Sequence, residues 1–193
     1  MARHTTFNKD QVLKDATNLF WKKGFHQTSI QDLVDTLGVN RASLYNTYQD
    51  KYGLFMSCYI AYRQQVLNQA KNILNEENTK KAFHNLFNEI NQSLANDINK
   101  KGCFLCNTYT ELLPSNNANI QQELLETKKL WIEIIANTLK RGIKNKEIKK
   151  NINTLETAHS IYASIVGIST LSKIANKTKN LQNSFDTHLK IFN

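Results

Sequence analysis

Apolar residues recur every three or four positions along most of this chain, the spacing of one buried face of an α-helix. The first such stretch covers about residues 9–23 and ends at Gly24. Two shorter stretches follow at about residues 28–36 and 41–48, with Gly38 in a tight turn between them. The pattern therefore predicts one helix followed by a pair of short helices.

Longer apolar stripes fill the rest of the chain. They predict a helix that begins after Asp50 and runs into the seventies, a helix with its apolar face from Phe83 to Ile98, a short helix before Pro114, a long helix from Ile120 to Ile143, and two final helices at about Thr154–Ala175 and Lys179–Phe192. With one proline, six glycines and no alternating strand pattern, the fold class is all-α. We expect a three-helix N-terminal domain at residues 1–54 and a six-helix domain at residues 55–193.

The two short helices are too short to be stable alone, so burial must hold them in place. Their inward positions are apolar: Ile30, Leu33, Val34, Leu37, Val39 and Leu44. The second helix then presents Arg41, Ala42, Ser43, Tyr45, Asn46 and Thr47 outward. None of these is acidic, small residues allow close approach to base edges, and Arg41 can pair with a guanine. An ordinary helical hairpin with a solvated face is the alternative.

The net charge and composition indicate which kinds of binding partner and which cell compartment fit this chain. A net charge of +9 favours a polyanion such as nucleic acid, although the codon bias of an AT-rich genome also produces lysine-rich chains. No run reaches the roughly 18 apolar residues of a membrane span, and the first ten residues lack the apolar core of a secretion signal. Three cysteines do not make a disulfide framework, which fits a reducing cytoplasm.

The segment TSIQDLVDTLGVNRASLYNTYQDKYGLF, residues 28–55, resembles the DNA-binding signature of the TetR family of repressors. The preceding ATNLFWKKGFHQ resembles the first helix of that family. The resemblance implies a helix-turn-helix domain and a ligand-binding helical domain. It places base contacts at Gln31, Arg41, Ala42, Ser43 and Thr47, and phosphate contacts at Thr28, Ser29, Tyr45, Asn46 and Lys51. Tyr48, Gln49 and Tyr52 depart from the usual residues of the signature.

The last two helices carry apolar stripes that either close the core of the monomer or join two copies. One stripe contains Ile161, Ile165, Ile168 and Leu171, with Ser164 and Gly167 allowing close approach, and the other contains Leu181, Phe185, Leu189 and Phe192. The resemblance implies a four-helix interface made from these two helices in a homodimer.

The family resemblance also implies a small-molecule site inside the C-terminal helices. The aromatic residues expected to line it are Phe83, Phe87, Phe104, Tyr109, Trp131 and Tyr162, for each of which plain core packing is the alternative. The sequence does not identify the effector, and hydrophobic, aromatic or cationic compounds all fit.

Cys103 and Cys106 share a helix face, and the neighbouring Lys100 and Lys101, together with the N-terminus of the helix, are expected to lower the pKa of Cys103. Zinc binding would need two more ligands, and a thioredoxin-like role would need a βαβ context. GCFLCNTYTEL resembles a stretch of TetR-family subgroups that sense oxidants or electrophiles. Cys103, with Cys106, is therefore a possible redox sensor, and inert packing is the alternative.

These observations predict a repressor that binds a palindromic DNA operator as a homodimer, is released by a small molecule, and works in the bacterial cytosol at the nucleoid. A redox- or electrophile-sensing repressor, and a helical interaction protein without DNA binding, are the alternatives. No nucleophile–base set, phosphate loop or metal quartet is present, so we expect no enzyme, cofactor, metal or membrane partner.

Overall fold

The computed structural model describes residues 7–112, 118–174 and 185–192, and within these residues every regular element is helical. The elements are α1 (Lys9–Lys23), α2 (Ile30–Leu37), α3 (Arg41–Tyr48), α4 (Lys51–Leu74), α5 (Thr79–Ala95), α6 (Phe104–Leu112), α7 (Ala118–Lys144), α8 (Thr154–Leu171) and η1, a 3-10 turn at Lys190–Phe192 that follows helical residues 185–189. The predicted all-α class is confirmed.

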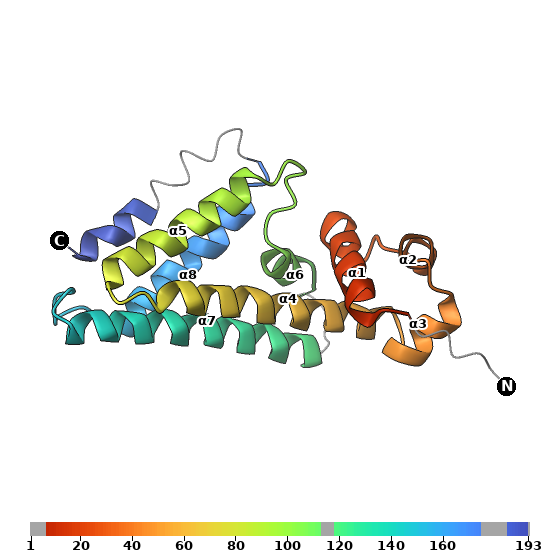
Figure 1. The fold of residues 1–193 in the computed structure, drawn as a ribbon, viewed down its shortest axis with the longest axis horizontal. Coiled ribbons are helices and arrows are strands. Elements are labelled where there is room, and N and C mark those ends of the chain that lie inside the picture. Colours follow the sequence, from red (N-terminus) through yellow and green to blue (C-terminus); the bar gives the residue numbers. More distant parts are fainter. Residues whose placement is uncertain (1–6, 113–117, 175–184, 193) are drawn as a thin grey trace.

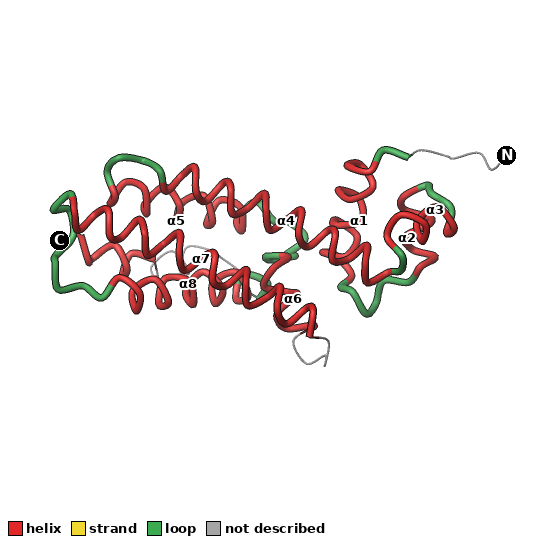
Figure 2. The backbone as a smooth tube through the Cα atoms, turned by 90° about the horizontal axis from the view of Figure 1, so that it is seen from below, coloured by secondary structure: helices red, strands yellow, loops and turns green. Residues whose placement is uncertain are grey.

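The molecule is elongated, with α1, α2 and α3 at one end and the helices α5, α7 and α8 toward the other (Figure 1). The long helix α4 starts beside α3 and continues into the C-terminal helices, and a view turned by 90° shows the same arrangement (Figure 2). α4 therefore joins the two ends of the molecule.

Polar side chains fix the starts of the N-terminal helices. Asn8 caps α1 by accepting hydrogen bonds from two backbone amides, Asn40 caps α3 and Asp50 caps α4. At α2, Ser29 and Asp32 form a reciprocal capping box. Each cap satisfies a backbone N–H that has no partner inside the helix and contributes about 1 kcal/mol.

One hydrophobic cluster holds the N-terminal helices against the rest of the molecule. Phe20 of α1, Leu33 of α2 and Leu44 of α3 are buried in it together with Phe55 of α4 and Phe104 of α6. The cluster also includes residues of α7. It thus crosses the predicted domain boundary at residue 54, where α4 continues without a break.

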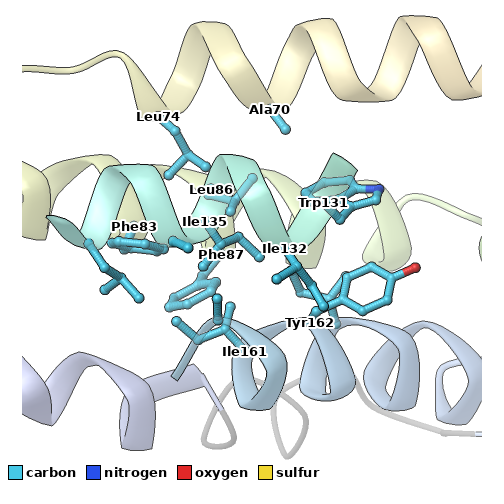
Figure 3. Packing of buried hydrophobic residues seen from close by; sticks show 14 of the residues in the cluster. Ala70, Leu74, Phe83, Leu86, Phe87, Trp131, Ile132, Ile135, Ile161 and Tyr162 are labelled. Atoms are coloured by element: carbon cyan, nitrogen blue, oxygen red, sulfur yellow. The ribbon is translucent and has the colours of Figure 1, made fainter. Parts of the chain in front are cut away.

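A second cluster fills the space between α4, α5, α7 and α8. Leu74, Phe83, Ile135 and Ile161 come from these four helices in turn, and each is almost fully buried. Figure 3 shows their side chains meeting between the helices. This cluster is the core of the C-terminal domain.

Two of the expected helix ends differ from the structure. The helix predicted to continue to Ile98 ends at Ala95, and the side chain of Ile98 is 92% exposed. Polar residues follow Ala95, and Asp97 accepts a hydrogen bond from the backbone amide of Gly102, so the chain turns away from the core. α8 ends at Leu171, and residues 175–184 lie outside the described part of the chain. Among the described residues, no helix has the length and apolarity needed to cross a membrane.

Candidate nucleic-acid interface and sensor cavity

The turn between α2 and α3 sets the direction of α3. Gly38 has φ 63° and ψ 22°, the left-handed conformation that glycine adopts without a steric cost. No atom lies within 4 Å of the position that a Cβ would take there, so conformation and not space requires the glycine. Val39 and Leu44 are buried on either side of Asn40, the residue that caps α3. The opposite face of α3 is therefore turned to solvent.

The exposed face of α3 carries one cation and no acid. Arg41, Ala42, Asn46 and Thr47 are exposed, and Tyr45 is half-buried. Arg41 donates a hydrogen bond from Nη2 to the hydroxyl of Tyr45 at 3.2 Å, and its guanidinium lies 5.1 Å from the centre of the Tyr45 ring. The two side chains lie along the same edge of the helix, which orders the guanidinium at the surface.

The acidic side chains of α2, close to α3, accept hydrogen bonds from residues of α1 and α2. The amide of Gln31 donates to Asp35 at 2.8 Å. Asp32 accepts a hydrogen bond from Lys23 at 2.7 Å, and this bond, together with those from Ser29, lowers the pKa of Asp32 to about 2. The carboxylates next to α3 are thus paired.

Lys51 ties the start of α4 to the loop between α1 and α2. Its ammonium donates to the carbonyl oxygens of Phe25 and Thr28, both at 2.9 Å, and lies 4.3 Å from the centre of the Phe25 ring. One of its three N–H donors is left for another acceptor. Thr28 is fully buried and donates its hydroxyl to the carbonyl of Gly24. The structure therefore removes the Thr28 side chain from the set that can reach a phosphate.

The chain between α3 and α4 contains a strained turn. Gln49 has φ 70° and ψ −57°, and the amide of Asp50 donates to the carbonyl of Tyr48 at 2.9 Å across it. This is the rare form of the γ-turn, which is unfavourable for a residue with a side chain. Gly53 follows, where a Cβ would lie 2.0 Å from the carbonyl oxygen of Tyr48. The turn places the end of α3 directly against the start of α4.

A cavity lies between α1, α4, α5, α7 and α8, and it offers about 130 Å³ to the centres of water-sized molecules. Most of its wall is apolar: Trp21, Val66, Ala70, Ile73, Leu86, Ile90, Leu94, Leu105, Trp131, Ile165 and Val166. The polar contributions include Tyr62, Gln69, Glu89, Ser93, Cys103, Cys106, Tyr162 and Ser169. A mostly apolar cavity with a few polar groups is the usual form of a small-molecule site.

The aromatic residues expected in a pocket fall into two groups. Trp131 and Tyr162 line the cavity, and Tyr109 shares a 2.6 Å hydrogen bond between hydroxyls with Tyr162 without being part of the wall. Phe83 and Phe87 lie in the C-terminal core, where the ring of Phe87 stacks on Phe185 at 4.3 Å. Phe104 lies in the N-terminal cluster. For Phe83, Phe87 and Phe104, the alternative of core packing describes what the structure shows.

Cys103 lies at the wall of the cavity, directly before the first residue of α6. A hydrogen bond from the Cys106 thiol, the backbone amides of Leu105 and Cys106, and the Tyr62 hydroxyl lower the pKa of Cys103 to about 7 against the effect of burial. The same pairing raises the pKa of Cys106 well above its ordinary value.

Of the two causes expected from the sequence, the start of the helix contributes through the backbone amides of Leu105 and Cys106, whereas Lys100 and Lys101 are not among the groups that shift the pKa of Cys103. The ammonium of Lys101 lies instead 4.1 Å from the centre of the Trp21 ring. Cys58, the third cysteine, is buried, and burial raises its pKa to about 12. Within the described residues, no group of three His, Cys, Asp or Glu side chains is placed to hold a metal ion.

Four residues expected at a dimer interface are already buried by their own chain. Ile161, Ile165, Ile168 and Phe185 are each less than 10% exposed and belong to the C-terminal core. Their side chains face the core of the monomer, which is the alternative that the sequence left open for this stripe. Leu189 packs partly against the same core, and Leu181 lies outside the described residues.

The outward face of α8 has a different composition. Leu171 remains 49% exposed and Leu155 54%, and His159 and Ala163 between them are exposed as well. Gly167 continues this face, and outside its own helix backbone no atom of the described residues lies within 4 Å of the position that a Cβ would take. These five residues recur every four positions and form one face, called the α8 outer face below.

Several residues of the cavity wall were not predicted from the sequence. Trp21 comes from α1, and Tyr62 from α4. Glu89 and Ser93 are polar residues beside the apolar stripe of α5, at positions three and seven after Leu86. Polar side chains within an inward helix face are the signal that would have pointed to a cavity there.

A short exposed helix held by two others, joined to a helical domain with an internal cavity, defines a helix-turn-helix protein with a helical binding domain. The family profile described as "Bacterial regulatory proteins, tetR family" matches residues 12–58, and the profile "Tetracyclin repressor-like, C-terminal domain" matches residues 81–187. The chain belongs to the TetR family of bacterial regulatory proteins.

Individual proteins are similar to parts or all of the chain. The "HTH-type transcriptional repressor ComR" of Escherichia coli is 30% identical over 116 residues, which cover 59% of this chain and 55% of that protein. The "Uncharacterized HTH-type transcriptional regulator YezE" of Bacillus subtilis is 32% identical over 120 residues, 59% of each. The matched regions therefore span little more than half the length of these curated relatives.

Solved structures share the fold over nearly the whole chain. A cysteine mutant of the TetR family transcriptional regulator CifR, complexed with a 26-bp double-strand operator DNA, has a TM-score of 0.85 at 19% identity and covers 99% of this chain and 100% of that one. The reduced form of Escherichia coli NemR has a TM-score of 0.82 at 17% identity and covers 95% of this chain and 96% of that one.

The turn at Gln49 generates a stability prediction. Replacing Gln49 by glycine removes the steric cost of the positive φ, so we expect the free energy of unfolding to rise by about 1 kcal/mol. Circular dichroism during heating should show a midpoint about 2–4 °C higher. Gln49→Ala, which shortens the side chain but keeps its Cβ, is the control and should bring no such gain. An unchanged or lower midpoint for Gln49→Gly would contradict the strain.

Proposed function

We propose that this protein is a transcriptional repressor that binds a palindromic DNA operator as a homodimer in the bacterial cytosol, associated with the nucleoid. The observation that carries the proposal is the exposed face of α3, where Arg41 is ordered along Tyr45 and no acidic residue is present. The DNA complex of the CifR mutant and the name of the ComR repressor support the same activity.

On this proposal, α3 enters the major groove, and residues of α3 and of the neighbouring α2 and α4 make two sets of contacts. Gln31, Arg41, Ala42, Ser43 and Thr47 contact bases, and Ser29, Tyr45, Asn46 and Lys51 contact phosphates. The remaining N–H donor of Lys51 is available to a phosphate oxygen, while its other two donors hold the loop after α1. Base contacts give sequence preference, and phosphate contacts give the salt-dependent part of the affinity.

We further propose that a small molecule in the cavity weakens DNA binding. The cavity wall includes Trp21 of α1, whose indole N–H donates to the carbonyl of Gly102 at 3.1 Å. A second link joins the same parts, because the carboxylate of Glu111 in α6 accepts from the backbone amide of His26 at 2.8 Å. A ligand that moves Trp21 or α6 therefore acts on α1, which packs against α2 and against α4, the helix on which α3 packs.

A second candidate function is the sensing of electrophiles by Cys103, which the lowered pKa of this cavity-wall thiol favours. With a pKa of about 7, a large share of the thiol is thiolate at neutral pH, and thiolate is the nucleophile. Its sulfur would bond to the β-carbon of an α,β-unsaturated aldehyde. The electron pair of the carbon–carbon double bond then forms an enolate, which takes a proton from Tyr62 or water.

The base contact at Arg41 can be tested by DNA binding. We expect Arg41→Ala to lose about 1–3 kcal/mol of discrimination at one base pair of each half-site, since a bidentate arginine–guanine pair has that value. Gel shifts with the DNA that flanks its reading frame, and with single-base variants of it, measure this change. Lys144→Ala removes the same charge at the exposed end of α7 and should preserve the preference. An unchanged base preference for Arg41→Ala would exclude the contact.

Dimerisation through the α8 outer face can be tested separately. We expect Ala163→Glu to place a carboxylate between the two copies and to reduce the mass in light scattering from twice 22.2 kDa to 22.2 kDa. Asn85→Glu adds the same charge at an exposed position of α5 and should stay dimeric. If Ala163→Glu also keeps the double mass, two copies do not meet through this face.

The cysteine hypothesis predicts a pH-dependent reaction. Acrolein should modify Cys103 with a rate that rises through about pH 7, because the thiolate forms there, and should release operator DNA. Mass spectrometry and gel shift follow the two events. Cys58→Ser is the control and should behave like the unchanged protein. If Cys103→Ser protein releases DNA as readily as the unchanged protein, Cys103 is not the sensor.

A further inference from the structure

The cavity opens to solvent, and the exposed part of its wall is polar while the buried part is mostly apolar. Gln69 and Ser93 are exposed and Glu89 is half-buried, and all three line the cavity from α4 and α5. The deeper wall is formed by side chains such as Leu86 and Trp131, which are almost fully buried. A molecule that fits this shape has an apolar body and a polar end.

The mouth carries a single charge. Glu89 is the only carboxylate among the described residues that line the cavity, no Lys, Arg or His is present among them, and none of the ion pairs in the described part of the chain includes Glu89. Gln69 donates from Nε2 to Oε1 of Glu89 at 2.7 Å, which holds the carboxylate in place and leaves its other oxygen without a hydrogen-bond donor among the described residues. The negative group is notable in a chain of net charge +9.

The aromatic side chains of the cavity favour the same sign of ligand charge. Trp21, Tyr62, Trp131 and Tyr162 all contribute to the wall, and an aromatic ring presents a negative face to a cation. Trp21 already makes a cation–π contact, because the ammonium of Lys101 lies 4.1 Å from the centre of its ring. An anionic ligand would meet both the carboxylate and these rings, so the cavity disfavours it.

We infer that the cavity binds a small lipophilic cation, an amine or quaternary ammonium compound, with its hydrocarbon body inside and its charged end beside Glu89. This rests on the proposed effector function of the cavity and names the chemical class of the effector. The interior offers about 130 Å³. One water molecule needs about 10–15 Å³ of such volume, so the cavity has room for roughly ten non-hydrogen atoms, the size of one substituted benzene ring.

The chain contains its own reporter for this binding. It has two tryptophans, Trp21 and Trp131, and both line the cavity, so a ligand that enters changes their fluorescence. Three probes of equal size separate charge from shape: benzyltrimethylammonium, its neutral carbon isostere neopentylbenzene, and the anion benzylphosphonate. We expect the cation to bind at least tenfold more tightly than the neutral probe, and the anion more weakly than both.

Glu89→Gln is the decisive variant, because it keeps the shape of the side chain and removes its charge. It should lose the tenfold preference for benzyltrimethylammonium while its affinity for neopentylbenzene stays the same, which also shows that the cavity is intact. Glu133→Gln changes an exposed carboxylate of α7 outside the cavity and should leave all three affinities unchanged. Equal binding of cation and neutral probe, or a preference that survives in Glu89→Gln, would overturn the inference.

The outcome is distinct from that of the DNA experiment. Operator binding of the ligand-free protein is measured by gel shift without any probe, and release is measured by adding benzyltrimethylammonium to the complex. Binding of the cation beside Glu89 without any operator binding would refute the repressor and leave the ligand class standing. Operator binding together with equal affinity for all three probes would refute the ligand class alone.

Discussion

The contact between Trp21 and the segment before α6 joins the two halves of this protein. The indole N–H of Trp21 donates to the carbonyl of Gly102, and its ring meets Tyr62 edge-on at 5.1 Å and Phe104 at 6.3 Å. Gly102 in turn has φ 69°, and a Cβ there would lie 2.9 Å from the carbonyl oxygen of Ser169 in α8. One short segment is thus packed between α1 on one side and α8 on the other.

These contacts link the exposed helix α3, the cavity and the α8 outer face. α1 packs against α2 and α4, and α4 packs against the exposed helix α3; the segment at Gly102 forms part of the cavity wall, and α8 carries the outer face proposed for the dimer. A shift of the segment at Gly102 acts on α1 through the hydrogen bond to Trp21, and on α8 through the close packing against Ser169. Because well-packed groups move between discrete arrangements, a small change at the cavity can alter the position of α3.

Sequence reasoning predicted the helix-turn-helix well because its signals are local. Asn40, Gly38 and the buried Leu44 act within a few residues of one another, and a cap or a turn has the same meaning in any fold. The interface and the cavity depend on which helices meet. The stripe through Ile161 is apolar enough for either role, and only the packing against α5 and α7 shows that it is core. The role of Glu89 in the cavity wall was not predicted for the same reason, since a single acidic residue on an amphipathic helix is usually interpreted as part of its solvent-exposed face.

The cavity itself has an energetic consequence for how a ligand acts. An unfilled apolar space costs stability, because the side chains around it lack contact partners on one side. Here the wall is shared by α1, α4, α5, α6, α7, α8 and the loop before α6, so the missing contacts are at the junction between the two halves. A ligand that fills the space restores those contacts only in the arrangement that accommodates it. It shifts the protein toward that arrangement by no more than its difference in affinity for the two states. The charge at the mouth then selects which ligand enters, and the junction at Trp21 determines what its entry changes.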